Sequence, residues 1–196
     1  MTKRIFDIIL SFLGLSMLLP VLILLSLAVL LGSKGPIFYI QQRVGKNNKD
    51  FGLFKFRTMF VDSDKKGLLT VGNKDNRITK TGGFLRKYKL DELPQLLNVL
   101  LGDMSLVGPR PEVRKYVEMY DAEQIKVLDV QPGITDFASI EFIDENRILG
   151  ESADPEATYI NEIMPAKIKL NMKYVEQKGL VTDVKIILLT IRKIVS

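Results

Sequence analysis

The sequence predicts a predominantly helical α+β protein that begins with a membrane helix. The first observation is a long apolar run at residues 5–31, which meets the length test for a membrane segment. The second is a pair of short segments rich in aromatic and aliphatic residues, 37–43 and 50–57, which predicts a β-hairpin. The third is helical periodicity in much of the remaining chain. We therefore expect a membrane helix at residues 1–33 and a second domain at residues 34–196.

The membrane helix has a break near its middle. A straight helix over residues 5–31 would be about 40 Å long against a hydrocarbon core of about 30 Å, so it can cross with tilt. Pro20 removes a backbone hydrogen bond and kinks the helix, and each half alone is too short to cross. Lys3, Arg4 and Lys34 make both flanks basic, which favours both ends on the cytoplasmic side. The residues leave two alternatives, a re-entrant helix and a single kinked span.

The composition excludes several kinds of chemistry. The chain has no Cys and no His, so disulfides, thiolate nucleophiles, Ser-His-Asp triads and His-based zinc sites are excluded. Catalysis would have to use carboxylates, Lys, Arg, Tyr, hydroxyl groups or a metal. The net charge of +5 is spread along the chain, and together with a membrane segment it favours anionic lipids and phosphate groups as partners over nucleic acid.

After the membrane helix, a loop and a hairpin are expected. The segment 32–36 is rich in Gly and Pro, and the turn-like segment 45–48 separates the two predicted strands. Residues 62–80 are polar and contain several glycines. We interpret them as a candidate mobile loop.

The next helix carries an acidic pair at its start. Leucines at helical spacing over residues 93–101, with Gly102 just past the end, predict a helix that begins near Asp91 and Glu92. Free N–H groups and the helix dipole stabilise a carboxylate or a bound phosphate there, and two adjacent carboxylates suit Mg²⁺. The alternative is structural, with Asp91 as an N-cap and Glu92 as a favourable first-turn acid.

Arg110 lies between Pro109 and Pro111. The two prolines restrict the backbone to extended conformations and hold the guanidinium in one direction, as two-pronged phosphate recognition requires. The alternative is a rigid surface turn with a solvated arginine.

The rest of the chain reads as further helices. The pattern is helical over residues 112–130, breaks at 131–135, and is helical again between the loop at 154–155 and Gly179. The last predicted helix, 183–194, has an apolar face and a basic face. It fits an interfacial amphipathic helix, and it fits equally a packed terminal helix with a basic solvent face.

These motifs together resemble the monotopic polyprenyl-phosphate phosphoglycosyl transferases, a family of bacterial sugar transferases, in their small form that is little more than the catalytic domain. The resemblance runs nearly end to end. It rests on KRIFD at 3–7, Pro20, QRVG at 42–45, KFRTM at 55–59, DNRIT at 75–79, LDELPQ at 90–95, NV at 98–99, GDMSLVGPRP at 102–111 and PGIT at 132–135.

The resemblance implies transfer of a sugar 1-phosphate from a UDP-sugar to undecaprenyl phosphate, with release of UMP, on the cytoplasmic face of the bacterial inner membrane. It implies a re-entrant helix broken at Pro20. By the same resemblance, Asp91 is the nucleophile of a two-step ping-pong reaction and Glu92 is a ligand of Mg²⁺. Phosphate or substrate contacts are expected from basic side chains, namely Arg110, Arg86, Arg57, Lys55 and Arg77. For Arg77 an ion pair with the nearby Asp75 is an equal alternative.

Two features depart from the family pattern. Leu19 precedes the proline where members often have Ser, and Asp136 follows the PGIT segment where many relatives have Gly. Two rival readings also remain: a non-catalytic membrane-anchored module that binds a phosphorylated lipid, and a single-displacement transferase in which Asp91 serves only as a second metal ligand.

Overall fold

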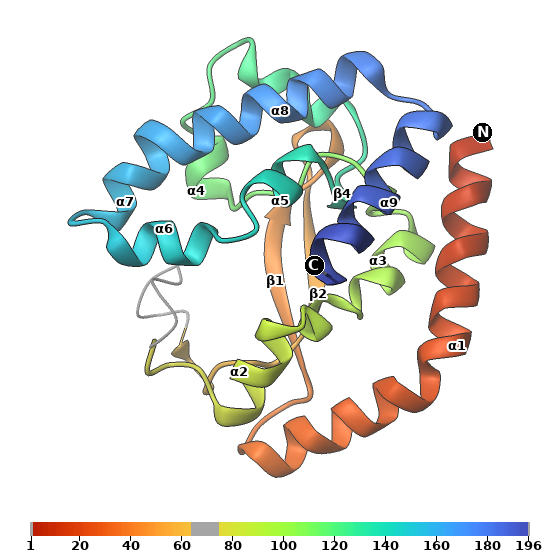
Figure 1. Cartoon of the computed structure of the whole chain (residues 1–196), viewed down its shortest axis with the longest axis vertical. Helices are drawn as coiled ribbons and strands as arrows, with labels where there is room; N and C mark the ends of the chain where they lie inside the picture. Colours follow the sequence, from red (N-terminus) through yellow and green to blue (C-terminus); the bar gives the residue numbers. More distant parts are fainter. Residues whose placement is uncertain (1, 64–74, 196) are drawn as a thin grey trace.

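The first helix, α1 (Thr2–Gly32), is the apolar helix that the sequence predicts. The computed structural model describes residues 2–63 and 75–195. Pro20 lies inside α1, and Figure 1 shows that the helix bends between its two halves, so that the second half passes under α2 (Lys80–Lys87). Within the described residues, α1 is the helix that is long and apolar enough to cross a membrane, by length and composition. Most of its large apolar side chains are exposed.

The start of α1 is tied to the rest of the molecule by its two basic residues. The ammonium of Lys3 donates to the carbonyl of Val107 at 3.0 Å and pairs with Asp183 at 2.6 Å. The guanidinium of Arg4 donates to two carbonyls at the end of α3 (Gln95–Leu101), where backbone acceptors have no partner within the helix. These contacts give the basic flank a structural role in addition to the role in membrane topology that the sequence predicts.

Asp7 is the charged residue inside the apolar run, and it is fully buried. Its carboxylate accepts from the hydroxyl of Ser105 at 2.8 Å and from the peptide N–H of Leu106 at 3.2 Å. Both belong to β3 (Ser105–Val107), so the second turn of α1 holds this strand in place. A buried carboxylate is tolerated because it is hydrogen-bonded.

The end of α1 is held by Arg57. Its guanidinium donates to the carbonyls of Ser33 at 2.7 Å, Val29 at 3.3 Å and Lys34, and the residue is buried. The last carbonyls of a helix lack partners in the helix, and a cation there is favourable. Both ends of α1 are therefore bound to the same body.

The predicted β-hairpin is confirmed. Strands β1 (Phe38–Val44) and β2 (Asp50–Phe56) pair antiparallel, with a turn between them in which Asn47 and Asn48 adopt positive φ. Asparagine tolerates this conformation better than most residues. The register sets Tyr39 opposite Lys55 and therefore on the same face of the sheet.

A second sheet, absent from the sequence-based expectations, pairs β3 in parallel with β4 (Gly133–Thr135). Gly108 and Gly133 approach so closely that a Cβ on Gly133 would lie 2.0 Å from the Gly108 nitrogen. No other residue fits this position without moving the backbone. The close approach brings the PGIT and VGPRP segments together.

The prediction of one helix over residues 112–130 is wrong. The structure has α4 (Arg114–Val117) and a 3₁₀ helix, η4 (Gln124–Asp129), separated by a turn. The cause is Asp121, whose carboxylate accepts from the peptide N–H groups of Glu123 and Gln124 and so competes with helical bonding. Apolar residues on both sides of the turn pack into one core cluster.

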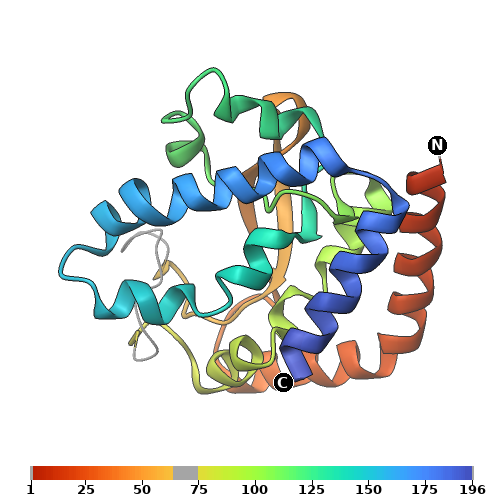
Figure 2. The ribbon, with the colours of Figure 1, turned by 45° about the horizontal axis from the view of Figure 1, so that its top comes forward.

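The remaining helices form the upper and outer layers. The predicted helix before Gly179 is confirmed, with a π-helical segment within it, and the last helix begins three residues before its predicted start. Figure 2 shows α8 running across the molecule, with α5 and η4 beside it. The bounds are α5 (Phe137–Glu141), α6 (Glu145–Glu151), α7 (Pro155–Thr158), η5 (Tyr159–Ile163), α8 (Met164–Gln177) and α9 (Leu180–Val195).

The expected loop at 62–80 lies mostly outside the described residues, since 64–74 are not described. Its last residue begins α2, a helix that we did not predict. Thr79 caps α2 by accepting from the Gly82 N–H at 2.9 Å. The division of the chain into domains 1–33 and 34–196 stays a prediction.

Candidate active site

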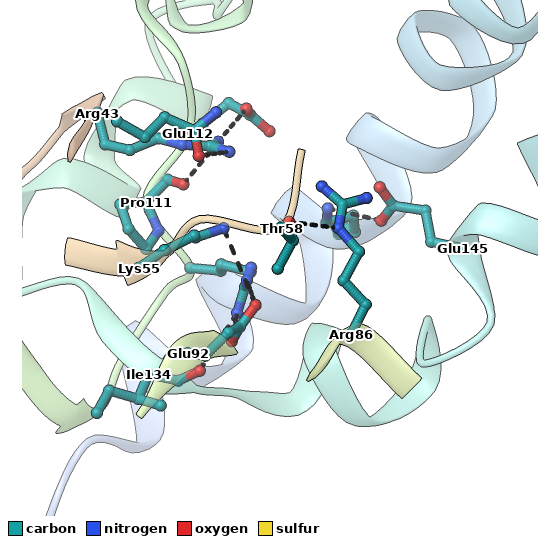
Figure 3. Close-up of polar contacts among 12 residues, drawn as sticks. Arg43, Lys55, Thr58, Arg86, Glu92, Pro111, Glu112, Ile134 and Glu145 are labelled. Atoms are coloured by element: carbon teal, nitrogen blue, oxygen red, sulfur yellow. Dashed lines mark hydrogen bonds and ion pairs between the residues drawn. The ribbon is translucent and has the colours of Figure 1, made fainter. Parts of the chain in front are cut away.

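Glu92 and Arg110 form the central ion pair of the site. The Glu92 carboxylate accepts from both terminal nitrogens of the Arg110 guanidinium, with Nη1 at 3.0 Å from Oε2. The ammonium of Lys55, on β2, lies 4.0 Å from Glu92 Oε1, and Figure 3 shows it pointing at that carboxylate. A two-pronged arginine–carboxylate pair fixes both side chains in direction. Segments far apart in the sequence therefore meet at Glu92.

The acidic pair lies in a short 3₁₀ turn, η3 (Leu90–Glu92), and the α-helix α3 begins only at Gln95. Lys89 precedes the turn with φ of 56°, a left-handed conformation that non-glycine residues seldom adopt. The expected helix start at Asp91 and Glu92 is thus a 3₁₀ turn. Asp91 is not an N-cap, because Lys89 occupies the cap position of η3 and Pro94 that of α3.

Asp91 differs sharply from its neighbour Glu92. Asp91 is buried, it borders a cavity, and within the described residues its carboxylate has no hydrogen bond or ion pair. Burial, with a smaller addition from the charge of Glu92, raises the pKa of Asp91, although Lys55 and Arg86 act against the rise. Burial also acts to raise the pKa of Glu92, but Arg110 and Lys55 outweigh it and hold that pKa well below its usual range. One carboxylate is thus neutralised by partners and the other is left unpaired.

The cavity beside Asp91 has a volume of about 360 Å³. It lies between the hairpin, the segment after β2 and the last turn of α2. One part of its lining is cationic and another is aromatic and aliphatic. The cationic side chains are Arg43, Lys55, Arg57, Arg77 and Arg86, and the apolar ones include Phe38, Phe56, Met59, Phe60 and Val61.

Of the predicted cations, Lys55 and Arg86 act to lower the pKa of Asp91 through their charge. Burial lowers the pKa of Lys55 to about 8, although the nearby Glu92 acts to raise it. Burial also lowers the pKa of Arg86, against the charge of Asp91. The Arg86 Nε donates to the hydroxyl of Thr58 at 2.9 Å, as drawn in Figure 3, and this contact fixes the guanidinium beside the cavity.

Arg57 and Arg77 border the cavity but have other contacts. Arg57 donates to carbonyls at the end of α1, as described above. Arg77 pairs with Asp75 through several hydrogen bonds, with Nη2 at 2.6 Å from Oδ2, which is the structural alternative considered from the sequence. Their phosphate contacts therefore stay predictions. Each guanidinium would have to bind phosphate either with its present hydrogen bonds intact or after breaking them.

Sequence reasoning missed three residues around the site. Arg43 borders the cavity and pairs with Glu112 at 3.0 Å, Thr58 holds Arg86, and Asp136 accepts from the Arg110 peptide N–H. The strand period of two offered a signal for Arg43, because the hairpin register sets it on the same face as Tyr39 and hence as Lys55. Nothing in the sequence pairs Asp136 with Arg110, since the contact joins two loops 26 residues apart.

The residues fit a magnesium ion that arrives with a phosphate ligand. Within the described residues there is no group of three or more acidic side chains that could hold a metal by themselves. Mg²⁺ needs only one or two carboxylates when substrate phosphates and water supply the other oxygens. Asp91 provides a hard oxygen donor at the cavity and Glu92 provides a second one at the next position in the chain. The raised pKa of Asp91 reflects in part the like charge of Glu92, which a cation would offset.

The arrangement has the elements needed for phosphoryl chemistry. It combines an unpaired carboxylate, a cavity of ligand size and several fixed cations around them. A carboxylate can act as a nucleophile toward phosphorus, and fixed cations stabilise the charge of the phosphoryl group and of the leaving group. No side chain of the described site offers a thiol or an imidazole.

Comparison with known proteins agrees with a site for phosphoryl chemistry. Residues 1–196 match the model of the family described as bacterial sugar transferase. The chain is 36% identical over 197 residues to a UDP-N-acetylgalactosamine-undecaprenyl-phosphate N-acetylgalactosaminephosphotransferase of Aeromonas hydrophila, covering 99% of this chain and 44% of the relative. It is 40% identical over 193 residues to the uncharacterized sugar transferase EpsL of Bacillus subtilis, covering 98% of this chain and 86% of the relative. It is 37% identical over 195 residues to a UDP-glucose:undecaprenyl-phosphate glucose-1-phosphate transferase of Escherichia coli, covering 97% of this chain and 39% of the relative. The chain thus spans less than half the length of two of these relatives.

Proposed function

The chain belongs to the bacterial sugar transferase family, and from this premise we propose that it transfers a sugar 1-phosphate from a UDP-sugar to undecaprenyl phosphate and releases UMP. The names of the Aeromonas and Escherichia relatives support this reaction class. They carry different sugars in their names, so the proposal leaves the sugar open. The reaction is proposed for the cytoplasmic face of the bacterial inner membrane.

The observation that carries the proposal is the contrast between two adjacent carboxylates. Glu92 is held by Arg110 in a two-pronged ion pair, while Asp91 borders the cavity without a partner among the described residues. Environments that separate the pKa values of neighbouring acids are typical of sites in which the two acids have different tasks. We assign Asp91 as the nucleophile and Glu92 as the group that orders the surrounding cations.

In the proposed first step, an oxygen of the ionised Asp91 attacks the β-phosphorus of the UDP-sugar. A bond forms between this oxygen and phosphorus, the bond from phosphorus to the bridging oxygen breaks, and UMP leaves with the bonding pair. In the second step an oxygen of undecaprenyl phosphate attacks the same phosphorus. The acyl phosphate bond breaks, Asp91 is regenerated as a carboxylate, and the lipid carries a diphosphate linked to the sugar.

The cations of the site have separate tasks in this scheme. Lys55 lies between Glu92 and the cavity and is suited to a phosphate of the donor, and Arg86 is held at the cavity by Thr58. Arg110 is directed by Glu92 and contributes its positive charge at fixed geometry. Mg²⁺, when bound at Glu92, would neutralise charge on the diphosphate.

The proposal includes a re-entrant α1. Lys3 and Arg4 at its start, and the carbonyls around Ser33 at its end, contact the same globular body. A helix that crossed the bilayer would separate its ends by about 30 Å of hydrocarbon, so these shared contacts support entry and exit on one side. Exposed apolar side chains on the neighbouring helices are suited to the interface of that leaflet, namely Phe84 on α2, Tyr88 directly after it, and Leu97 and Leu101 on α3. Single cysteines at Thr2 and Ser33 should be labelled from the same side of sealed vesicles, whereas opposite labelling would restore the spanning helix.

The test of the reaction uses purified protein in lipid with Mg²⁺, a panel of UDP-sugars and no acceptor. We expect a burst of UMP stoichiometric with enzyme for at least one sugar, and an intact-mass increase that equals one phosphosugar. Asp91→Asn should lose both, because the amide is a poor nucleophile. The matched control is Asp50→Asn, an exposed acid on the hairpin that should retain the burst.

Two rival readings predict different results. If the protein is a binding module for phosphorylated lipid, no UDP-sugar gives UMP, with or without undecaprenyl phosphate. If transfer occurs by single displacement, UMP appears only when acceptor is present, and no covalent adduct forms on Asp91.

A further inference from the structure

The backbone of the loop that carries Arg110 has few hydrogen-bond donors. Proline has no peptide N–H, so between Pro109 and Pro111 the Arg110 N–H is the only donor. This N–H donates to Oδ2 of Asp136 at 3.0 Å. A single side chain therefore holds the one backbone donor at the position from which the guanidinium extends.

Asp136 is fully buried and directly follows β4. Its second oxygen, Oδ1, accepts from the Ser139 N–H at 2.5 Å, which caps the start of α5. Within the described residues its carboxylate has no ion pair with Lys or Arg. A buried carboxylate with only peptide partners is costly unless its hydrogen bonds are maintained, so this geometry is strongly defined.

The contact completes a series between the two loops. Gly108 N–H donates to the carbonyl of Thr135 at 3.0 Å, and Gly133 N–H donates to the carbonyl of Pro109, also at 3.0 Å. These two bonds use backbone atoms alone, so many sequences could make them. The third bond, to Arg110, depends on the side chain at position 136.

We propose that Asp136 is a positioning residue, which holds the Arg110 backbone so that the guanidinium meets Glu92 and the donor phosphates in one fixed direction. This inference rests on the proposed function. Arg110 is held at two points: its peptide N–H by Asp136 and its side chain by Glu92. Releasing the first lets the loop shift, and displacement of a charged group by about 1 Å can cost about 100-fold in rate.

The competing explanation is that Asp136 only caps α5. The chain offers a matched control, because Asp154 caps α7 by accepting from the Ala157 N–H at 3.0 Å. The hydrogen bonds of Asp154 go to Ser152, Ala157 and Thr158, and among the described residues it has none with Arg110 or Glu92. Asp154→Ala therefore removes a cap of the same type without affecting the site.

The kinetic experiment compares Asp136→Ala, Asp154→Ala, Arg110→Lys and the double variant Asp136→Ala with Arg110→Lys, using the full-length protein in lipid. We expect Asp136→Ala to lower kcat/KM for UMP release by about 10- to 100-fold, and Asp154→Ala by less than about threefold. In the Arg110→Lys background, adding Asp136→Ala should lower kcat/KM further by less than about threefold, because the two residues act as one unit. Equal losses in the two cap variants, or full losses that multiply in the double variant, would overturn the proposal.

A second measurement keeps the inference testable without catalysis. In protein with ¹⁵N-labelled arginine, exchange of the Arg110 amide hydrogen should be slow in the parent protein and in Asp154→Ala, and at least about tenfold faster in Asp136→Ala. If Asp136→Ala does not fold, Asp136→Asn replaces it, because the amide oxygen can serve only one of the two N–H groups. Unchanged protection in both Asp136 variants would refute the positioning role. A parent protein that turns over no sugar nucleotide would refute the proposed function alone, while amide exchange still decides this contact.

Discussion

The two sides of the site treat charge in opposite ways. On the Arg110 side, Glu92 takes both prongs of the guanidinium, and Asp136 takes its peptide N–H. On the cavity side, Asp91 has no partner among the described residues, although Lys55 and Arg86 lie near enough to affect its pKa. In the proposed reaction, the Arg110 side is therefore organised before substrate binds. On the cavity side, the charges of Asp91, Lys55 and Arg86 are available to interact with substrate. Preorganised charge is effective because little rearrangement is needed during the reaction.

The sharpest way to break this contrast is Arg110→Ala. Loss of the guanidinium leaves Glu92 without its main partner, and the pKa of Glu92 should rise because burial is no longer outweighed. We expect kcat/KM for UMP release to fall by at least about 100-fold. The matched control is Arg114→Ala, which removes a surface arginine paired with Asp50 and should change kcat/KM by less than about twofold. Comparable losses in the two variants would contradict a special role for Arg110.

The charge state of Lys55 sharpens the comparison through pH. The ordinary pKa of lysine is 10.5, and burial lowers that of Lys55 to about 8, so the free enzyme should lose this positive charge as pH rises through about 8. Asp91 must be ionised, so activity should also fall on the acid side, through a pKa above the ordinary value for Asp. We expect a bell-shaped profile of kcat/KM with its basic limb near pH 8.

Lys55→Arg tests the assignment of that limb. Arginine stays protonated, so the basic limb should move to higher pH, while the value at pH 7 falls by about tenfold because the fork geometry differs from that of an ammonium. Lys46→Arg, at an exposed position in the hairpin turn, should leave the profile unchanged. A basic limb that persists near pH 8 in Lys55→Arg would assign it to another group.

The smallest effect is expected from Thr58→Val, which removes the hydroxyl that accepts from Arg86 Nε and leaves the charge in place. We expect KM for the UDP-sugar to rise by about three- to tenfold with kcat changed less, because orientation alone is lost. Thr182→Val, which removes an exposed hydroxyl bonded to a backbone carbonyl, serves as the control. A fall in kcat with unchanged KM would place Arg86 in the chemical step instead of in binding.

Much of the fold follows from local pattern. The apolar run, the alternation around the Asn47–Asn48 turn and Gly102 at the end of α3, with φ of 99°, each act over a few residues and each predicted its element. The two failures have different causes. The helix expected after Glu112 is interrupted by Asp121, whose side chain competes for the backbone N–H groups. The parallel pairing of β3 with β4 joins segments separated by about a seventh of the chain, beyond the reach of a local pattern.

The site divides in the same way. Asp91, Glu92 and Arg110 were selected from the sequence because their motifs are unusual, and the structure brings Glu92 and Arg110 into contact. The sequence does not tell which of two adjacent acids is paired, because that depends on the direction of Arg110 and on Lys55 from a distant strand. For Arg57 the resemblance implied a phosphate contact. The structure places its guanidinium on carbonyls at the end of α1 and the residue in the cavity lining, so the phosphate contact stays a prediction.

The ion pair between Lys3 and Asp183 joins positions 180 residues apart. Because Lys3 is synthesised long before Asp183, the ammonium has no access to this partner until the intervening 179 residues have been made. The start of α1 is therefore fixed against α9 late in folding, and formation of this ion pair requires the first and the last helix of the described chain to be in place together.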